Sequence, residues 1–217
     1  MSFSDATTFT TRTLGDAWLA VAARILDSGR SSLYDALPIL EIAQATLEIA
    51  EPDPNDEQIA RLADPERLEW MRRNFVDPAR VAALGDARSY ASRLHDYGAS
   101  GRDQLEWVIE RLLADPSSRS ATITTFEPLL DTSYIPCVSL LDFWIPHDAV
   151  DLVVYAHSID FGAKGYANLI QLAELQWQVA ARLRREPGHL TVIVKSAHVY
   201  DTDAAFMRGA LAQATPS

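Results

Sequence analysis

The chain of 217 residues contains a single cysteine, so no disulfide can form within it and a reducing compartment, the cytoplasm, is expected. No run of about 18 apolar residues occurs, and no transmembrane helix is therefore expected. The first residues, MSFSDATTFTTR, lack the basic start and apolar core of a secretory signal peptide. These absences favour a cytoplasmic protein that does not enter a membrane.

Positive charge is also scarce. Lys and Arg together number 19 against 30 Asp and Glu, which gives a formal net charge of −11 at pH 7. A chain this acidic repels the phosphates of DNA and RNA, so nucleic acid polymers are not expected as partners. A single nucleotide remains compatible, because it needs only a local positive site.

Length and composition are typical of one globular domain. With 48% hydrophobic and 23% charged residues, the chain can bury a sizeable core, and we expect a single domain over residues 1–217. No internal repeat or low-complexity segment is visible in it.

The pattern of apolar residues predicts an α+β fold. Spacings of three and four predict helices at residues 14–26, 65–73, 102–114, 166–184 and 204–211. Runs rich in β-formers predict strands at residues 37–52, 121–126, 138–145, 152–155 and 190–194. The Ser/Thr-rich residues 1–12 are expected to fray, and the polar residues 53–86 to form an insertion or a lid. We therefore expect one large mixed β-sheet flanked by helices.

Polar side chains follow two of the predicted strands, in the segment 151–203. Backbone order at the end of a strand can hold such side chains at the rim of a sheet, where small-ligand pockets form. An Asn lies near the start of the helix between the two strands. The residues concerned are His157, Ser158, Asp160, Asn168, His198 and Tyr200.

The order and spacing of these residues resemble the thymidylate synthase family, especially its short archaeal-type members. YAHSID is similar to the family's Tyr-x-Arg-Ser-x-Asp strand end, an Asn follows eight residues past the Asp, and HVY matches its His-x-Tyr. Upstream, DQLEWVIERLLADPSSRS resembles the family's Asp-Gln helix and Pro-x-x-Arg-Arg phosphate loop, and YIPCV resembles its catalytic Pro-Cys strand. The resemblance covers about residues 90–203 and implies a thymidylate synthase-like fold.

The resemblance also implies that Cys137 is a nucleophile. In the family this thiolate adds to C6 of a pyrimidine ring, because C5 is a poor nucleophile until that addition makes it carbanion-like. The thiolate needs a positive neighbour, for which Arg119 and His157 are the candidates. Without the resemblance, a lone cysteine in an apolar run would be interpreted as an inert core residue.

Two further catalytic roles follow from the resemblance. Tyr90 matches a Tyr whose phenol helps to move a proton from C5, although Ala91 replaces the family's Gly. The family's general-acid Glu lies on an N-terminal helix, where Glu69 is the first candidate and Glu66 the second. A solvated charge on the helix is the more common role of such a carboxylate and is the alternative for both. Trp70 is available for the folate side of the site.

The resemblance assigns the remaining polar residues to binding. Asn168 would read uracil, because one amide can match both O4 and N3–H, although Asn also suits a helix N-cap. His198 and Tyr200 would bind the sugar hydroxyl, and Ser158 would still offer a hydroxyl at the phosphate site. Asp160 would contact the pterin ring of the folate. The alternatives are a surface pair at a strand end for His198 and Tyr200, and a surface loop residue for Asp160.

The phosphate site departs from the family pattern. The family uses several arginines there, some from the partner subunit; Arg119 remains here, but Ser120 and His157 occupy two arginine positions. Loss of two guanidiniums removes bidentate phosphate contacts. Three possibilities follow: His157 is a weaker cation, the phosphate sits differently, or the substrate is not an ordinary 5′-monophosphate.

We therefore expect an enzyme that methylates or hydroxymethylates C5 of a uridylate-type nucleotide through a Cys137 adduct, with methylenetetrahydrofolate as co-substrate. The alternatives are a specialised homologue acting on a modified nucleoside or pyrimidine-like substrate, and a homologue that binds a nucleotide without turnover. A homodimer is expected, because family members pair through their sheets and the strand at 138–145 is apolar on both faces. Coverage of both faces by helices of the same chain would remove that expectation. No metal site is predicted.

Overall fold

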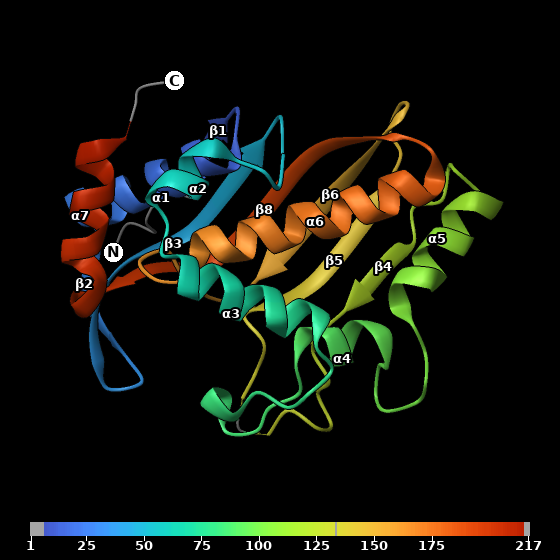
Figure 1. Ribbon diagram of the computed structural model, residues 1–217, viewed down its shortest axis with the longest axis horizontal. Helices are drawn as coiled ribbons and strands as arrows, with labels where there is room; N and C mark the ends of the chain where they lie inside the picture. Colours follow the sequence, from blue (N-terminus) through green and yellow to red (C-terminus); the bar gives the residue numbers. More distant parts are fainter. Residues whose placement is uncertain (1–6, 133, 215–217) are drawn as a thin grey trace, which may run out of the picture.

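The computed structural model describes residues 7–132 and 134–214 and has one mixed β-sheet at its centre (Figure 1). Its strands lie in the order β1-β3-β8-β6-β5-β4, with β2 paired to β3 and β7 paired to β8. β1 is parallel to β3, and β8 is parallel to both β6 and β7, whereas the other pairs are antiparallel. The bounds are β1 (Thr7–Thr11), β2 (Arg30–Tyr34), β3 (Leu37–Ile49), β4 (Ala121–Thr124), β5 (Val138–Trp144), β6 (Ala149–Ala156), β7 (Ile159–Asp160) and β8 (Glu186–Tyr200).

Helices cover one face of this sheet. The long helix α6 packs on β6 and β8, α1 packs on β3 and β8, α5 packs on β4, and α3 packs on α6 (Figure 1). No helix of the described residues is both long and apolar enough to cross a membrane. The bounds are α1 (Leu14–Ser28), α2 (Glu57–Leu62), α3 (Pro65–Val76), α4 (Tyr90–His95), α5 (Gln104–Ala114), α6 (Gly165–Leu183) and α7 (Ala204–Gln213), with single 3-10 turns η1 (Ala82–Leu84) and η2 (Asp201–Asp203).

The core lies between the sheet and these helices. Along β8 the side chains of Leu190, Val192 and Val194 are fully buried, and the register aligns them with residues of β3 and β6 that are buried as well. The alternate side chains point the other way, where no helix of the described chain lies. The expected α+β fold, a large mixed sheet flanked by helices, is thus confirmed.

The uncovered face of the sheet is apolar at its centre. Leu140 and Trp144 of β5, Tyr155 of β6 and Ile193 of β8 are each between 37% and 39% exposed there. Helices of the same chain therefore do not cover both faces of β5. The unpartnered apolar surface is what the homodimer expectation requires.

Two expectations for the N-terminal part are corrected. Residues 7–11 do not fray but form β1, because the edge of β3 offers a full parallel ladder from Thr7↔Ala45 to Thr11↔Ile49. The segment 53–86 is not a detached insertion or lid, since its helices α2 and α3 bury Ile59 and Phe75 in the core. The strand β2 and the helix α4 had no counterpart among the predicted elements.

Local signals explain where α3 lies. Asp64 caps its N-terminus by accepting from the amides of Glu66 and Arg67, and Pro65 occupies the first helical position, where no amide hydrogen is needed. Glu66 and Trp70 are four residues apart and therefore share one face of this helix, whereas Glu69 lies on a neighbouring face.

Candidate functional site

Strand ends bring the predicted site residues together. The amide of His157 donates to the carbonyl of Cys137 at 3.0 Å, so the residues that follow β6 lie beside the start of β5. On the other side, β7 pairs with β8 so that Asp160 lies opposite His198. The strand ends on one side of the sheet therefore carry Cys137, Asp160 and the pair His198 and Tyr200.

Tyr90 lies next to the predicted nucleophile. The amide of Val138, the residue after Cys137, donates to the Tyr90 hydroxyl at 3.0 Å. Burial raises the pKa of Tyr90 well above its usual value, and the charge of Cys137 adds to this effect. The phenol therefore stays protonated, and it holds the backbone that carries the thiol.

A buried ion pair anchors the loop that leads to Cys137. Arg93 of α4 makes a bidentate contact with Asp131 at 2.7 and 2.8 Å and donates to the carbonyl of Thr125 at 2.8 Å. Asp131 also accepts from the amide of Glu127, and the Thr125 hydroxyl donates to the carbonyl of Val138. These contacts fix both ends of the loop between β4 and β5.

The thiol of Cys137 is half-buried and free. Burial raises its pKa, the charge of Lys164 lowers it, and the charge of Asp160 raises it further. The cation whose charge acts on this thiol within the chain is Lys164, which precedes α6 and was not among the two candidates, Arg119 and His157. Sequence reasoning missed Lys164 because nothing in its local pattern signals proximity to a thiol 27 positions earlier in the chain.

Lys164 and Asp160 line an open pocket of about 770 Å³. Its other walls include Glu66 and Trp70 of α3 and Tyr200 of β8. The Lys164 ammonium lies 5.8 Å from the Trp70 ring centroid, a cation–π contact. Burial raises the pKa of Asp160 to about 6, while Lys164 and two backbone amides oppose the shift. This pocket thus combines an aromatic face from Trp70 with the buried carboxyl group of Asp160.

His198 is buried, and its Nε2 has no hydrogen-bond partner among the described residues. Its Nδ1 lies 3.3 Å from the Ser158 hydroxyl, and its ring packs edge-on against Tyr34 and Tyr200. Burial lowers the pKa of His198 to about 4, so the imidazole is neutral at pH 7. Tyr34 contacts both His198 and Tyr200, and the sequence did not single it out because it lies in the unpredicted hairpin of β2 and β3.

Asn168 lies in the first turn of α6 and is buried. Its Nδ2 donates to the carbonyl of Lys164 at 3.1 Å, while its Oδ1 has no partner among the described residues. The helix begins at Gly165, so Asn168 is not an N-cap and that alternative is wrong. A buried amide with a free oxygen and a second hydrogen is suited to pair with a ligand edge.

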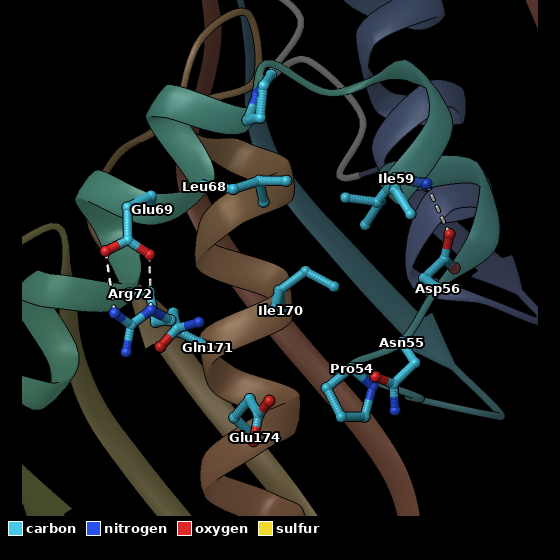
Figure 2. A pocket seen from close by; sticks show the side chains of 12 residues that line it. Pro54, Asn55, Asp56, Ile59, Leu68, Glu69, Arg72, Ile170, Gln171 and Glu174 are labelled. Atoms are coloured by element: carbon cyan, nitrogen blue, oxygen red, sulfur yellow. Dashed lines mark hydrogen bonds and ion pairs between the residues drawn. The ribbon is translucent and has the colours of Figure 1, made fainter.

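Glu69, the first candidate for the general acid, points into a different groove (Figure 2). That groove of about 430 Å³ lies between α2, α3 and α6 and has Ile170 and Glu174 on its α6 side. Hydrogen bonds from Arg72 and Arg73 hold the pKa of Glu69 at about 2, so it carries no proton at neutral pH. The structure brings Glu66, not Glu69, to the pocket of Asp160 and Lys164.

Arg119 lies away from the other site residues of its own chain. It precedes β4, whose Ala121 pairs with Phe143 near the end of β5, whereas Cys137 precedes the start of β5. At about 3.3 Å per residue, the length of β5 separates the two by roughly 20 Å. Ser120, in the second arginine position, accepts a hydrogen bond from Arg111. Within one chain neither residue lies near the thiol.

The fold is α+β, with a cysteine and a His-Tyr pair at the ends of neighbouring strands and a buried Asn side chain in the first turn of α6. A sequence model of the thymidylate synthase family matches residues 53–216. The chain therefore belongs to the thymidylate synthase family.

Individual relatives agree with this membership. A protein of Methanosarcina acetivorans named "Putative thymidylate synthase" is 38% identical over 146 residues, covering 64% of this chain and 67% of the relative. A protein of the same name from Methanococcoides burtonii is 31% identical over 201 residues and covers 88% of each chain. The "Thymidylate synthase" of Mycoplasma genitalium is 30% identical over 104 residues, 47% of this chain and 36% of that protein.

Proposed function

We propose that this protein transfers a one-carbon unit to C5 of a uridylate-type pyrimidine nucleotide, with methylenetetrahydrofolate as co-substrate. The observation that carries the proposal is the position of Cys137. It is the chain's single thiol, it precedes β5 next to the residue whose amide donates to Tyr90, and the charges of Lys164 and Asp160 act on its pKa. An inert core cysteine would need no cation whose charge lowers the pKa of its thiol.

In the proposed reaction the Cys137 thiolate forms an S–C6 bond with the pyrimidine. The π electron pair of the C5–C6 bond moves to C5 and O4, which makes C5 nucleophilic. When bound, the folate supplies the one-carbon unit and, for methylation, the hydride. The C5 proton is lost to water and the folate nitrogen leaves the transferred carbon. Hydride, or water in the case of hydroxymethylation, adds to that carbon as the S–C6 bond breaks, which restores the ring and the thiolate. Lys164 favours that thiolate both at the start and at the end of the cycle.

Asn168 is the proposed base reader. Its free Oδ1 can accept N3–H, and the second hydrogen of Nδ2 can donate to O4, a match that uracil offers and cytosine does not. We therefore propose uracil as the preferred base. The neutral imidazole of His198, with an unpartnered Nε2, and the hydroxyls of Ser158 and Tyr200 suit the sugar hydroxyl.

Glu66 is the proposed general acid, in place of Glu69. It faces the pocket of Asp160 and Lys164 together with Trp70, whereas Glu69 is held ionised by two arginines. Tyr90, whose phenol stays protonated, would act at C5 as a hydrogen-bond donor or through a water and not as a base. Asp160 and Trp70 are the proposed folate contacts.

Release of tritium from C5-tritiated nucleotides tests the proposal. Purified full-length protein is incubated with dUMP, UMP, dCMP and CMP, with and without methylenetetrahydrofolate. We expect release from a uracil nucleotide and no release by Cys137→Ala, whose smaller apolar side chain keeps the fold by circular dichroism. Release by Cys137→Ala at the wild-type rate would exclude the covalent route. No release from any of the four by wild-type protein would exclude the proposed activity.

A further inference from the structure

The hairpin of β2 and β3 brings Tyr34 against the His-Tyr pair of the candidate site. The centroid of its ring lies 5.3 Å from that of His198, edge-on, and 6.4 Å from that of Tyr200, nearly stacked. Tyr34 is the last paired residue of β2, and the two turn residues that follow, Asp35 and Ala36, have φ of 49° and 63°. Positive φ at both positions is the mark of the tight turns that join two antiparallel strands. The ladder and the turn therefore hold the Tyr34 ring in place.

The hydroxyl of Tyr34 is directed into the site. Burial raises the pKa of Tyr34, the charges of Cys137 and Asp35 add to the rise, and a hydrogen bond with the Ser158 side chain opposes it. A hydrogen bond that lowers the pKa of a phenol is one that the phenol oxygen accepts, because it stabilises the charged form. Ser158 therefore donates its one hydrogen to Tyr34.

This hydrogen bond decides what Ser158 can offer to His198. The Ser158 oxygen lies 3.3 Å from Nδ1 of His198, and its hydrogen is already engaged with Tyr34, so the oxygen accepts and Nδ1 carries the ring proton. The carbonyl of Ser196 also favours a proton on this ring. The hydrogen bond at one ring nitrogen sets the state of the other. Nε2, buried and without a partner among the described residues, is thus left with its lone pair.

We propose that Tyr34 is a positioning residue that acts through Ser158 and fixes His198 in the tautomer whose Nε2 accepts a hydrogen bond from the sugar hydroxyl. Without the phenol, Ser158 is free to donate to Nδ1, and the ring proton moves to Nε2, which can then no longer accept. The proposal rests on the proposed function only for the identity of the ligand hydroxyl. The order Tyr34, Ser158, His198 exists in the free protein.

Nitrogen-15 NMR of full-length protein labelled at its histidines tests this order without a ligand. The signals of His198 are assigned by their absence from His198→Ala. Because burial lowers the pKa of His198 to about 4, we expect a neutral ring at pH 7, with the proton on Nδ1 in the wild type. Tyr34→Phe keeps the ring and loses the hydroxyl, and it should move the proton to Nε2. The matched control is Tyr155→Phe, which removes a hydroxyl from the uncovered sheet face and should leave the His198 signals unchanged.

Calorimetric titration with dUMP and with its 2′,3′-dideoxy analogue tests whether the tautomer matters to a ligand. The analogue lacks the sugar hydroxyl that Nε2 would accept from. Tyr34→Phe should weaken dUMP binding about 2- to 10-fold, the size of one hydrogen bond, and leave binding of the analogue unchanged. Equal weakening of both ligands would show that Tyr34 does not act through His198 on the sugar.

Unchanged His198 signals in Tyr34→Phe would overturn the proposal, whatever the two ligands do. These signals are measured without ligand or turnover, so they separate the role of Tyr34 from the reaction. A ring proton that moves to Nε2 in Tyr34→Phe, when the wild type releases no tritium, would support the positioning role and refute the proposed function. Tritium release by a wild type whose His198 signals do not respond to Tyr34→Phe would do the reverse.

Discussion

The charges of Lys164 and Asp160 act in opposite directions on the pKa of the Cys137 thiol. Lys164 lowers the pKa of the thiol and Asp160 raises it, against a background of burial that raises it. In the free protein the thiol is therefore largely protonated at neutral pH. A ligand that displaces the charge of Asp160, or protonates it, would make the nucleophile stronger without any movement of the backbone.

Alkylation measures this balance directly, because the chain has one thiol and each event adds one mass increment. At pH 8, Asp160→Asn should speed reaction with iodoacetamide and Lys164→Gln should slow it, each by up to about tenfold, since one pKa unit changes the thiolate fraction tenfold. In the wild type the rate should keep rising above pH 9. Changes of the same sign in both variants would show that access to the thiol, and not charge, limits the rate.

Asp160 also makes stability depend on pH. Its pKa is raised from 3.8 to about 6, so the folded state holds a proton that the unfolded state releases. Stability from this group therefore falls as pH rises from about 4 to about 6, and the loss persists above pH 6. Asp160→Asn should be more stable than wild type at pH 7.5, by at most about 3 kcal/mol, and equal to it at pH 3.5.

Urea unfolding of the two proteins at both pH values checks the expectation. His198, whose pKa is lowered to about 4, titrates over the same range with the opposite sign. It is present in both proteins, so its contribution cancels in the difference. A difference in stability that does not change with pH would mean that the carboxyl is not the group responsible.

The sequence singled out candidate residues that follow strands, and it did not reveal residues that approach them only in space. His198, Ser158 and Asp160 were predicted because strand ends and a family resemblance marked them. Lys164 and Tyr34 carry no such mark, since one precedes a helix and the other ends a short strand. The sequence offered no physical basis for preferring Glu69 to Glu66. The orientation of α3 in the structure is what places Glu66, and not Glu69, at the pocket of Asp160 and Lys164.

At the scale of elements, a buried ion pair holds the loop between β4 and β5. The side chains of Arg93 and Asp131 are 2% and 5% exposed and contact each other bidentately. Such a pair adds little when intact but is costly to break, because the remaining charge stays buried. The position of Cys137 depends on it through Thr125 and Val138.

Asp131→Ala should therefore lower the free energy of unfolding by about 3–5 kcal/mol, measured by urea denaturation. The control is Glu106→Ala, which breaks the exposed pair with Arg182 on the helical surface and should change stability little. If the two variants lose the same free energy of unfolding, the buried pair does not hold the loop.

Helices were easier to predict than strands for a physical reason. A helix such as α6 repeats its apolar spacing over 19 residues, so its pattern is visible locally. The strand β1 is a five-residue Thr-rich segment whose structure comes from the edge of β3, 34 or more positions later in the chain. Pairing between distant segments leaves no local periodicity to detect.

At the scale of the molecule, the uncovered sheet face and the distant Arg119 point to the same partner. A second copy of the chain placed on the face of Leu140, Trp144, Tyr155 and Ile193 would bury that face and could bring its own Arg119 to the Cys137 site. We expect a homodimer in light scattering at micromolar concentration. Ile193→Lys, which places a charge in the apolar patch, should shift the mass towards a monomer.

Subunit complementation tests whether the partner completes the site. Cys137→Ala and Arg119→Ala proteins, each inactive or nearly so alone, are mixed, unfolded together and refolded. Random pairing makes half of the dimers mixed, and each mixed dimer has one site with both an intact Cys137 and a partner's intact Arg119. Tritium release should therefore recover to about a quarter of the wild-type rate, the fraction expected for one complete site in half of the dimers. Two inactive proteins that stay inactive as a mixture, while light scattering confirms dimers, would show that Arg119 does not act across the subunit contact.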